Sequence, residues 1–286
     1  MKKNVETFIG CDAEYEAAKI VMFGAPFDST TSYRPGARFG SASIRHESYG
    51  LETYSLYQDK DLEDCEIFDS GDLELCFGSS EAALSDIRDR ATEILEDGKL
   101  PFMIGGEHLV TLGAVRAAVT KYPELHIIHF DAHADTYSNG SSYDHGTMFY
   151  HAPKEGLIDV NKSVQIGIRT EFNEKDGFTV IDAIKANDLS VKTISDLIHN
   201  TVDNNPCYLT FDIDCLDPAF APGTGTPVMG GLNSDKVLKI LRALKDLNIV
   251  GMDVVEVCPC YDHGEITALA AATIALEMLY IKASGQ

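Results

Sequence analysis

Three side chains that can bind a metal ion stand at alternate positions in one short run. Asp131, His133 and Asp135 follow the apolar pair Ile127-Ile128. In a β-strand, residues i, i+2 and i+4 point to the same face, so these three polar groups can meet at one place. Two ionised carboxylates and an imidazole packed together repel each other and lose hydration unless a cation lies between them. The run therefore predicts a metal site.

Two other runs carry the same kind of chemistry. Asp212 and Asp214 alternate at the end of another strand-like stretch, and His108 follows Gly105-Gly106-Glu107. Four carboxylates and two imidazoles exceed what one structural zinc site uses, and they suit two divalent ions that share carboxylates. Oxygen-rich ligand sets with some imidazole favour manganese over zinc, and iron, cobalt and nickel are alternatives. Two such ions about 3.5–4 Å apart can hold a hydroxide nucleophile at neutral pH, so the predicted chemistry is hydrolysis.

Each candidate also has an ordinary structural explanation. His108 could cap or pack at the start of a helix, and Asp135 could be a helix N-cap. Asp212 and Asp214 could cap a turn before Asp217-Pro218. Each explanation is reasonable alone, but together they leave six metal-competent side chains unexplained, so we prefer the metal hypothesis.

The elements that must position these residues are short apolar stretches alternating with helical patterns. We expect strands over 20–23, 66–68, 101–104, 126–130, 164–168, 191–193, 207–211 and 249–257, and helices over 80–96, 109–121, 178–187, 195–202, 234–247 and 265–282. Apolar strands separated by helices predict a parallel sheet covered on both faces. Ligands bind beyond the carboxyl ends of such strands. The metal-ligand candidates and Glu256 all fall at the carboxyl ends of expected strands.

Composition limits the possible partners and the compartment. The 286 residues carry a formal net charge of −22, which makes nucleic acid and anionic membranes poor partners and weakly favours a cationic substrate. No stretch reaches the roughly 18 apolar residues of a membrane span, and the apolar segment 266–283 predicts a buried helix. Seven cysteines without close pairing favour a reducing cytoplasm. Without an evident linker or repeat, we expect one domain over 1–286.

The sequence resembles the ureohydrolase family, which includes arginase, agmatinase, guanidinobutyrase and formiminoglutamase. The segments that carry the resemblance are 24–28, 34–40, 105–108, 130–135, 144–149, 211–218, 221–227 and 251–257. The likeness covers nearly the whole chain and is greatest to the bacterial agmatinase branch. It implies a three-layer αβα arginase-like fold with a parallel sheet of about eight strands, and an assembly that is typically a trimer or hexamer.

The resemblance also implies which residue holds which metal ion. Asp131 and Asp212 would bridge two manganese ions. His108 and Asp135 would complete one site, and His133 would complete the other together with Asp214. A hydroxide between the two ions would attack the guanidinium carbon of the substrate.

The resemblance also implies which residues bind the substrate or transfer protons. Asp135 would relay a proton, and His145 would protonate the departing amine, with His151 as a weaker candidate. Glu256 would accept hydrogen bonds from the substrate guanidinium, whose planar donors require a facing carboxylate. Asn139 would be a further substrate contact.

The loop that begins at Asp131 gives evidence on the charge of the substrate. Residues 131–153 contain no Lys or Arg, so a substrate with a cationic far end fits better than one with a carboxylate. The resemblance implies hydrolysis of agmatine to putrescine and urea, a step of polyamine biosynthesis. Guanidinobutyrase or arginase activity remains an alternative, since helix N-termini and backbone amides also bind carboxylates.

Two hypotheses outside this family differ from it in the metal ligands that they require. A histone-deacetylase-like amidohydrolase would use a single zinc and fewer ligands, so six ligand positions argue against it. A binding protein that keeps the fold without catalysis would be expected to have lost ligands, and all six are present.

Overall fold

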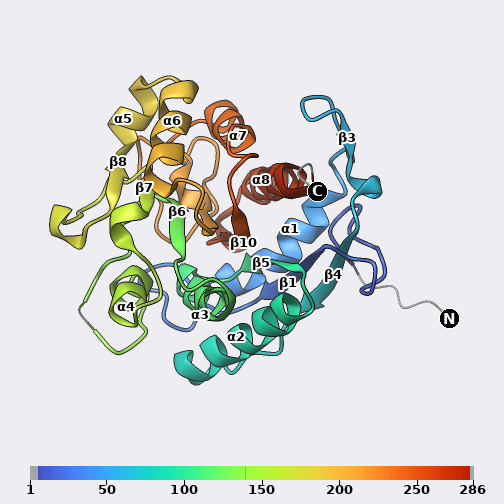
Figure 1. Ribbon diagram of the computed structural model, residues 1–286, viewed down its shortest axis with the longest axis horizontal. Helices are drawn as coiled ribbons and strands as arrows, with labels where there is room; N and C mark the ends of the chain where they lie inside the picture. The colour runs from blue at the N-terminus through green and yellow to red at the C-terminus, as the bar shows by residue number, and fades with distance from the viewer. Residues whose placement is uncertain (1–5, 139, 284–286) are drawn as a thin grey trace.

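The chain is described here by a computed structural model that covers residues 6–138 and 140–283. Its centre is an eight-stranded sheet in which all pairings among the described strands are parallel (Figure 1). In spatial order the strands are β4 (Ile67–Asp72), β1 (Ile20–Ala25), β5 (Leu100–Gly105), β10 (Ile249–Val255), β9 (Cys207–Asp212), β6 (His126–Phe130), β7 (Val164–Ile166) and β8 (Thr179–Ile181).

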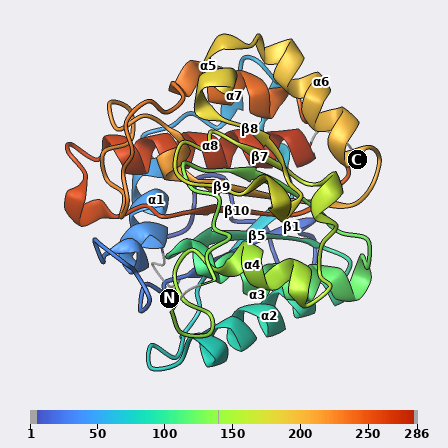
Figure 2. The same cartoon turned by 90° about the vertical axis from the view of Figure 1, so that its left-hand side faces the viewer.

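Helices cover both faces of this sheet (Figures 1 and 2). One face carries α1 (Gly40–Ser48), α5 (Ala183–Asp188), α6 (Val191–Val202), α7 (Ser234–Arg242) and α8 (Ile266–Ala283). The other face carries α2 (Ser80–Glu96), α3 (Thr111–Lys121) and α4 (Met148–Lys154). The expected three-layer αβα fold with a parallel sheet of about eight strands is confirmed.

Most strand positions are apolar, and the central strands β1, β5, β10, β9 and β6 are buried at nearly every position, so both of their faces lie in the core. In β1, Ile20 and Met22 pack into one layer while Val21 and Phe23 pack into the other. This division follows from the two-residue period of a strand, which sends successive side chains to opposite faces. The polar residues of the chain therefore gather where the strands end.

Helix α8 is the element most similar to a membrane span by length and composition. It has 18 residues and a mean hydropathy of 1.5, but 67% of it is buried inside the protein. It packs against α1, α7 and β10. The prediction of a buried helix over 266–283 is confirmed, and the hydropathy of α8 reflects the core that it fills.

Two expected elements are wrong. The strand expected over 191–193 is the first turn of α6, where the Ser190 hydroxyl accepts the backbone N–H of Thr193 at 3.1 Å and caps the helix. The helix expected over 178–187 is divided: Thr179–Ile181 forms β8 and pairs with β7, and α5 begins after its cap, Asp182. The sheet therefore has the expected number of strands, although β8 replaces one of the expected members.

Several short elements were not expected. They are α1, α4, the two-stranded antiparallel pair β2 (Tyr54–Ser55) and β3 (Lys60–Asp61), and the 3-10 turns Ala37–Phe39, Leu62–Asp64, His108–Val110, Val160–Lys162, Glu174–Asp176, Ile213–Cys215 and Pro259–Tyr261. Helix α4 has Pro153 in its last turn, and α1 begins with Gly-Ser-Ala-Ser. Neither sequence shows the apolar periodicity by which a helix is recognised.

Candidate active site

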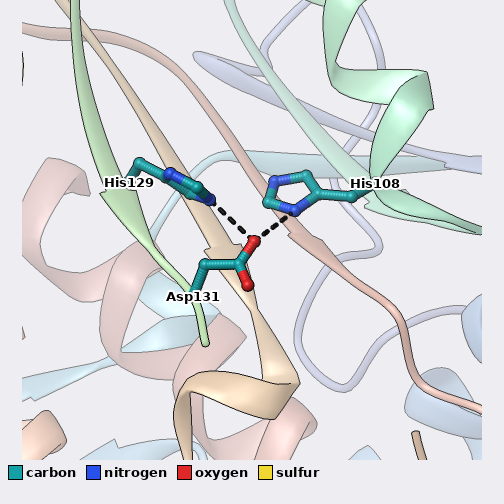
Figure 3. Close-up of side chains that lie close together, drawn as sticks. All are labelled: His108, His129 and Asp131. Atoms are coloured by element: carbon teal, nitrogen blue, oxygen red, sulfur yellow. Dashed lines mark hydrogen bonds and ion pairs between the residues drawn. The ribbon is translucent and has the colours of Figure 1, made fainter. Parts of the chain in front are cut away.

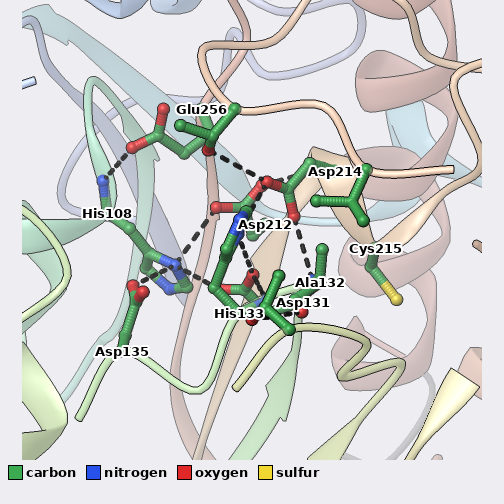
Figure 4. Close-up of polar contacts among 12 residues, drawn as sticks. His108, Asp131, Ala132, His133, Asp135, Asp212, Asp214, Cys215 and Glu256 are labelled. Atoms are coloured by element: carbon green, nitrogen blue, oxygen red, sulfur yellow. Dashed lines mark hydrogen bonds and ion pairs between the residues drawn. The ribbon is translucent and has the colours of Figure 1, made fainter. Parts of the chain in front are cut away.

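The four adjacent strands β5, β10, β9 and β6 deliver their carboxyl ends to one place. The residues at or just after these ends form a buried polar cluster (Figure 4). All six predicted metal ligands lie in it, together with Glu256. His108 follows β5, Glu256 follows β10, Asp212 ends β9 and Asp214 lies in the turn after it, and Asp131, His133 and Asp135 follow β6. The alternating ligand candidates therefore meet in one cluster, although most of them lie beyond the ends of the strands.

The first half of the cluster surrounds His108. Its Nδ1 lies 2.9 Å from Asp131 Oδ2, 3.3 Å from Asp212 Oδ2 and 3.4 Å from Asp135 Oδ2. Despite these short distances and its burial, Nδ1 has no hydrogen-bond partner among the described residues. Such a nitrogen among carboxylate oxygens needs a positive charge beside it.

The tautomer of His108 can be worked out from its other nitrogen. His108 Nε2 lies 2.8 Å from the hydroxyl of Thr210, and that hydroxyl donates its proton to Asp253 at 2.6 Å. Because its proton is already used, Thr210 must accept from Nε2–H, which leaves the Nδ1 lone pair facing the carboxylates. A lone pair and three carboxylate oxygens around one point form a ligand set for a cation.

The second half of the cluster surrounds His133. Its Nδ1 lies 3.1 Å from Asp214 Oδ2 and 3.3 Å from Asp131 Oδ1. The two oxygens of Asp131 therefore face different imidazoles, one in each half. Backbone amides fix these carboxylates: Ala132 N donates to Asp214 at 3.0 Å, and His133 N donates to Asp131 at 2.6 Å. This geometry fits two cation positions that share Asp131.

His129 is a member of the cluster that the sequence interpretation missed (Figure 3). Gln165 Nε2 donates to the carbonyl of Ala134 at 2.8 Å, which identifies this atom as the amide nitrogen, and it also lies 3.1 Å from His129 Nδ1. His129 Nδ1 is therefore an acceptor, and its Nε2–H donates to Asp131 Oδ2 at 2.8 Å. His129 orients a carboxylate that contacts both halves. The alternation could have revealed it, because His129 lies two residues before Asp131.

The buried carboxylates of the cluster outnumber its imidazoles. Burial, together with the charges of Asp214 and Asp131, raises the pKa of Asp212 well above its usual range, and burial beside Asp131 raises that of Asp135. Burial would lower the pKa of His108, but the charges of Asp131 and Asp135 raise it to about 9. These directions all mean that the carboxylates need positive charge, which either protons or divalent cations can supply.

Two of the cluster residues have unusual backbone conformations. Asp135 has φ 51° and Glu256 has φ 66°, both in the region that favours glycine. Such residues cost about 1–3 kcal/mol and persist only where surrounding contacts fix them. Here Phe149 N donates to the Asp135 carbonyl at 3.0 Å, and Glu256 N donates to the Gly106 carbonyl at 2.9 Å. The fold thus holds these two carboxylates in strained positions.

His145 lies beside the cluster on the loop before α4. Its Nδ1 is 2.9 Å from Oε2 of the buried Glu107 and 3.9 Å from Oε1 of Glu256. Burial would lower the pKa of His145, but the hydrogen bond to Glu107 and the charge of Glu256 raise it to about 9. Glu107 also accepts the backbone N–H and the hydroxyl of Thr30. Glu107 was not predicted as a site residue, although it lies directly before the predicted ligand His108.

A cavity of about 490 Å³ opens over His133, Asp135 and His145. Its described lining includes neither Lys nor Arg, and outside the metal-ligand candidates its one carboxylate is Asp144; the other lining residues are Thr30, Ser32, Tyr137, Gly146 and Thr226. Asn139, predicted as a substrate contact, lies outside the described residues. His151 does not line the cavity; its ring packs against Tyr143 and Tyr150.

Comparison with known proteins gives a consistent result. The family described as the arginase family matches residues 18–280. An agmatinase of Photorhabdus laumondii is 55% identical over 270 residues, covering 93% of this chain and 88% of the relative. A crystal structure of a hypothetical agmatinase from Burkholderia thailandensis is 41% identical, with a TM-score of 0.89 and coverage of 93% and 86%. Proclavaminate amidino hydrolase from Streptomyces clavuligerus is 39% identical, with a TM-score of 0.94 and coverage of 99% of each chain.

Proposed function

The chain belongs to the arginase family, and from that membership we propose that it is an agmatinase, which hydrolyses agmatine to putrescine and urea. The observation that carries the hydrolytic part is the pair of imidazoles, His108 and His133, on opposite oxygens of Asp131. Relatives named agmatinase at 55% identity support the substrate.

We propose that the cluster holds two Mn²⁺ ions. Metal dependence follows from the family and from the His and Asp groups brought together here. His108 and Asp135 would hold one ion and His133 and Asp214 the other, with Asp131 and Asp212 shared. When bound, such ions activate water as a nucleophile and stabilise developing negative charge.

The other site residues would bind the guanidinium and move protons. Oε2 of Glu256 is buried without a hydrogen-bond partner among the described residues, so it is available to a guanidinium N–H. An alkylamine has a pKa near 10 and leaves only when protonated, and His145, held protonated by Glu107, can supply that proton. Oδ atoms of Asp135, which lines the same cavity, would carry the proton toward His145.

The choice of substrate depends on the charge of the cavity lining that meets the end of the substrate opposite the guanidinium. A lining without Lys or Arg and with Asp144 fits the ammonium of agmatine better than the carboxylate of guanidinobutyrate or arginine. The fold does not decide this, since proclavaminate amidino hydrolase has a TM-score of 0.94 to this chain. Urea release from agmatine, arginine, guanidinobutyrate and formiminoglutamate tests the proposal. A preference for any of the last three would contradict it.

Asp144→Asn is expected to raise the KM for agmatine about tenfold, because it removes one charge interaction with the substrate ammonium. The KM for guanidinobutyrate should fall or stay the same. The Asn oxygen can still accept the His145 backbone N–H, as Asp144 Oδ1 does at 3.0 Å, whereas the longer 3.3 Å bond from the Ser141 backbone N–H to Oδ2 is lost. Steady-state urea release from both substrates is the measurement, and Asp235→Asn on the exposed side of α7 is the control. Equal changes for both substrates would show that Asp144 acts only on loop structure.

Removal of divalent cations by a chelator is expected to abolish urea release and lower the melting temperature, because the buried carboxylates then repel one another. Mn²⁺ should restore both. Metal analysis of the restored protein should give close to two Mn²⁺ per chain; one zinc per chain with full activity would favour the single-zinc alternative.

We also propose that the chain is one domain over 1–286 that works in the cytoplasm as a trimer or hexamer. Light scattering on the purified protein tests the assembly.

A further inference from the structure

An apolar groove of about 230 Å³ lies on the surface between α7, α8 and the loop after β9. Its described lining includes no charged side chain. The loop and α7 supply Leu216, Phe220 and Leu238, and α8 supplies Ile266 and Leu269. Phe220, Ile266 and Leu269 are exposed although they are apolar. An exposed apolar groove of this kind marks a surface that another molecule covers.

The apolar surface continues from the groove to α5. Met229 is 75% exposed and Ile184 is 76% exposed. The backbone N–H of Gly230 donates to Asp217 Oδ2 at 2.7 Å, and Asn187 Nδ2 of α5 donates to the Gly230 carbonyl at 3.3 Å, so α5 lies beside the loop that borders the groove. We call this surface the apolar face, and its exposed members are Ile184, Phe220, Met229, Ile266 and Leu269.

The apolar face is also nearly neutral in a strongly acidic chain. The segments 183–245 and 266–283, which build it, contain seven Lys and Arg and eight Asp and Glu, a net charge of −1, whereas the whole chain carries −22. Two copies therefore repel each other through the rest of their surface and approach most easily here. A cationic partner would be attracted to the acidic remainder instead. The occupant that fits an apolar and nearly neutral face is a second copy of this acidic chain.

One segment of the apolar face reaches the catalytic cavity. Thr226, three residues before Met229, lines that cavity, and its hydroxyl donates to Asp214 Oδ2 at 3.4 Å. Arg169 Nη2 donates to the carbonyl of Asp214 at 2.6 Å and to that of Val228 at 2.7 Å. Arg169 therefore joins the backbone beside Met229 to the backbone of a metal-ligand candidate. A contact that fixes Met229 also restricts the motion of this cavity wall.

We propose that the apolar face is the contact between copies of this chain, and that this contact holds the cavity segment 226–229 in place (Figures 1 and 2 show α5, α7 and α8 on one side of the sheet). The inference deepens the proposed assembly, because it assigns a surface to it and makes full activity depend on it. A second copy covers Ile184 and Met229 and fills the groove, which removes apolar surface from water.

Ile184→Glu and Leu269→Glu test the face, because each puts a charge at its centre. Both residues lie in the first turn of a helix, α5 or α8, where a carboxylate favours the fold. The dissociation constant between copies, from light scattering over a range of protein concentrations, should rise at least about a hundredfold, since the contact would bury a carboxylate without a partner. Leu56→Glu, on the turn between β2 and β3, is the matched control because Leu56 is also 76% exposed.

The control should assemble as the wild type does. An assembly unchanged in both helix variants, or lost equally in Leu56→Glu, would overturn the face. At a protein concentration where the wild type is assembled, the dissociated variants should show kcat/KM for agmatine at least about tenfold lower. Full activity of dissociated Ile184→Glu would overturn the role of the contact in the cavity.

Salt separates an apolar contact from an ionic one in the wild type. Raising the salt concentration from about 0.01 M to about 0.15 M shortens the Debye length from about 30 Å to about 8 Å and so screens the repulsion between the copies. The dissociation constant should fall at least about threefold over this range. A rise would mean that ion pairs hold the copies together, which would overturn the proposal.

Failure of the proposed function would give a different pattern, because light scattering needs no substrate. An assembly that the helix variants dissociate, in a protein that hydrolyses another guanidino compound, would contradict only the agmatinase proposal, and that compound would then replace agmatine in the activity comparison. A wild type that is monomeric at every concentration would overturn the apolar face together with the proposed assembly.

Discussion

Replacing Asp131 with Asn is expected to lower kcat/KM for agmatine by at least about a thousandfold, because one side chain serves both halves of the metal cluster. Asp131 Oδ2 faces His108 at 2.9 Å and Oδ1 faces His133 at 3.3 Å. An amide has one oxygen and one NH₂, so it can face a cation with one side only, and its NH₂ would point its hydrogens at the other. Metal analysis should show the loss of at least one Mn²⁺ per chain.

The control for this experiment is Asp182→Asn. Asp182 caps α5 by accepting the backbone N–H of Lys185, a contact that Asn can also make. This variant should keep full activity and metal content. Asp131→Asn with two Mn²⁺ bound and near-normal urea release would contradict the two-metal mechanism.

Glu256→Gln is expected to lower kcat/KM about a hundredfold to a thousandfold while the metal ions stay bound. The shape of the side chain is unchanged, and its oxygen can still accept the His108 backbone N–H, now at 2.6 Å from Oε1. The NH₂ then takes the place of Oε2 and presents hydrogens to a guanidinium that has only hydrogens to offer. Both binding and the reaction should suffer, so KM should rise and kcat should fall.

Metal content separates this explanation from a structural role of Glu256. Loss of Mn²⁺ from Glu256→Gln would mean that Glu256 supports or coordinates the metal ions rather than the substrate. The exposed Glu93 of α2 provides the control, since Glu93→Gln should change neither the metal content nor kcat/KM.

The metal cluster could be predicted from the sequence because its members depend on one general property of the fold. Each candidate follows an apolar stretch, and parallel strands deliver their carboxyl ends to one edge of a sheet. His108, Asp131 and Asp212 needed no knowledge of strand order to be placed together. Their placement in one cluster follows from residue type and position alone.

The alternation could place His129 near the cluster, but the partners that orient His129 and Glu107 lie in distant segments. Glu107 reaches Thr30, which is 77 residues away, and the orientation of His129 is set by Gln165, 36 residues away. Such contacts arise from the register and packing of elements, which local pattern does not encode.

The two wrong elements show a limit of local preference. Residues 191–193 contain two β-branched side chains, which favour a strand, but the Ser190 cap and the packing of α6 favour a helix. Residues 179–181 are all β-branched and do form a strand, since the edge of the sheet next to β7 accepts them. Tertiary contacts decide both cases.

The strand order has a consequence for how the protein is made. Strands β4, β1 and β5 pair with one another, and so do β6, β7 and β8, but the two groups are joined only through β10 and β9. In chain order β10 comes after all the other strands of the sheet, so it is the last strand to leave the ribosome. His108 and Glu256, in contact across 148 residues, meet only at that stage. A nascent chain that ends before β10 therefore cannot assemble the site, so we expect metal loading to require the completed polypeptide rather than its growing form.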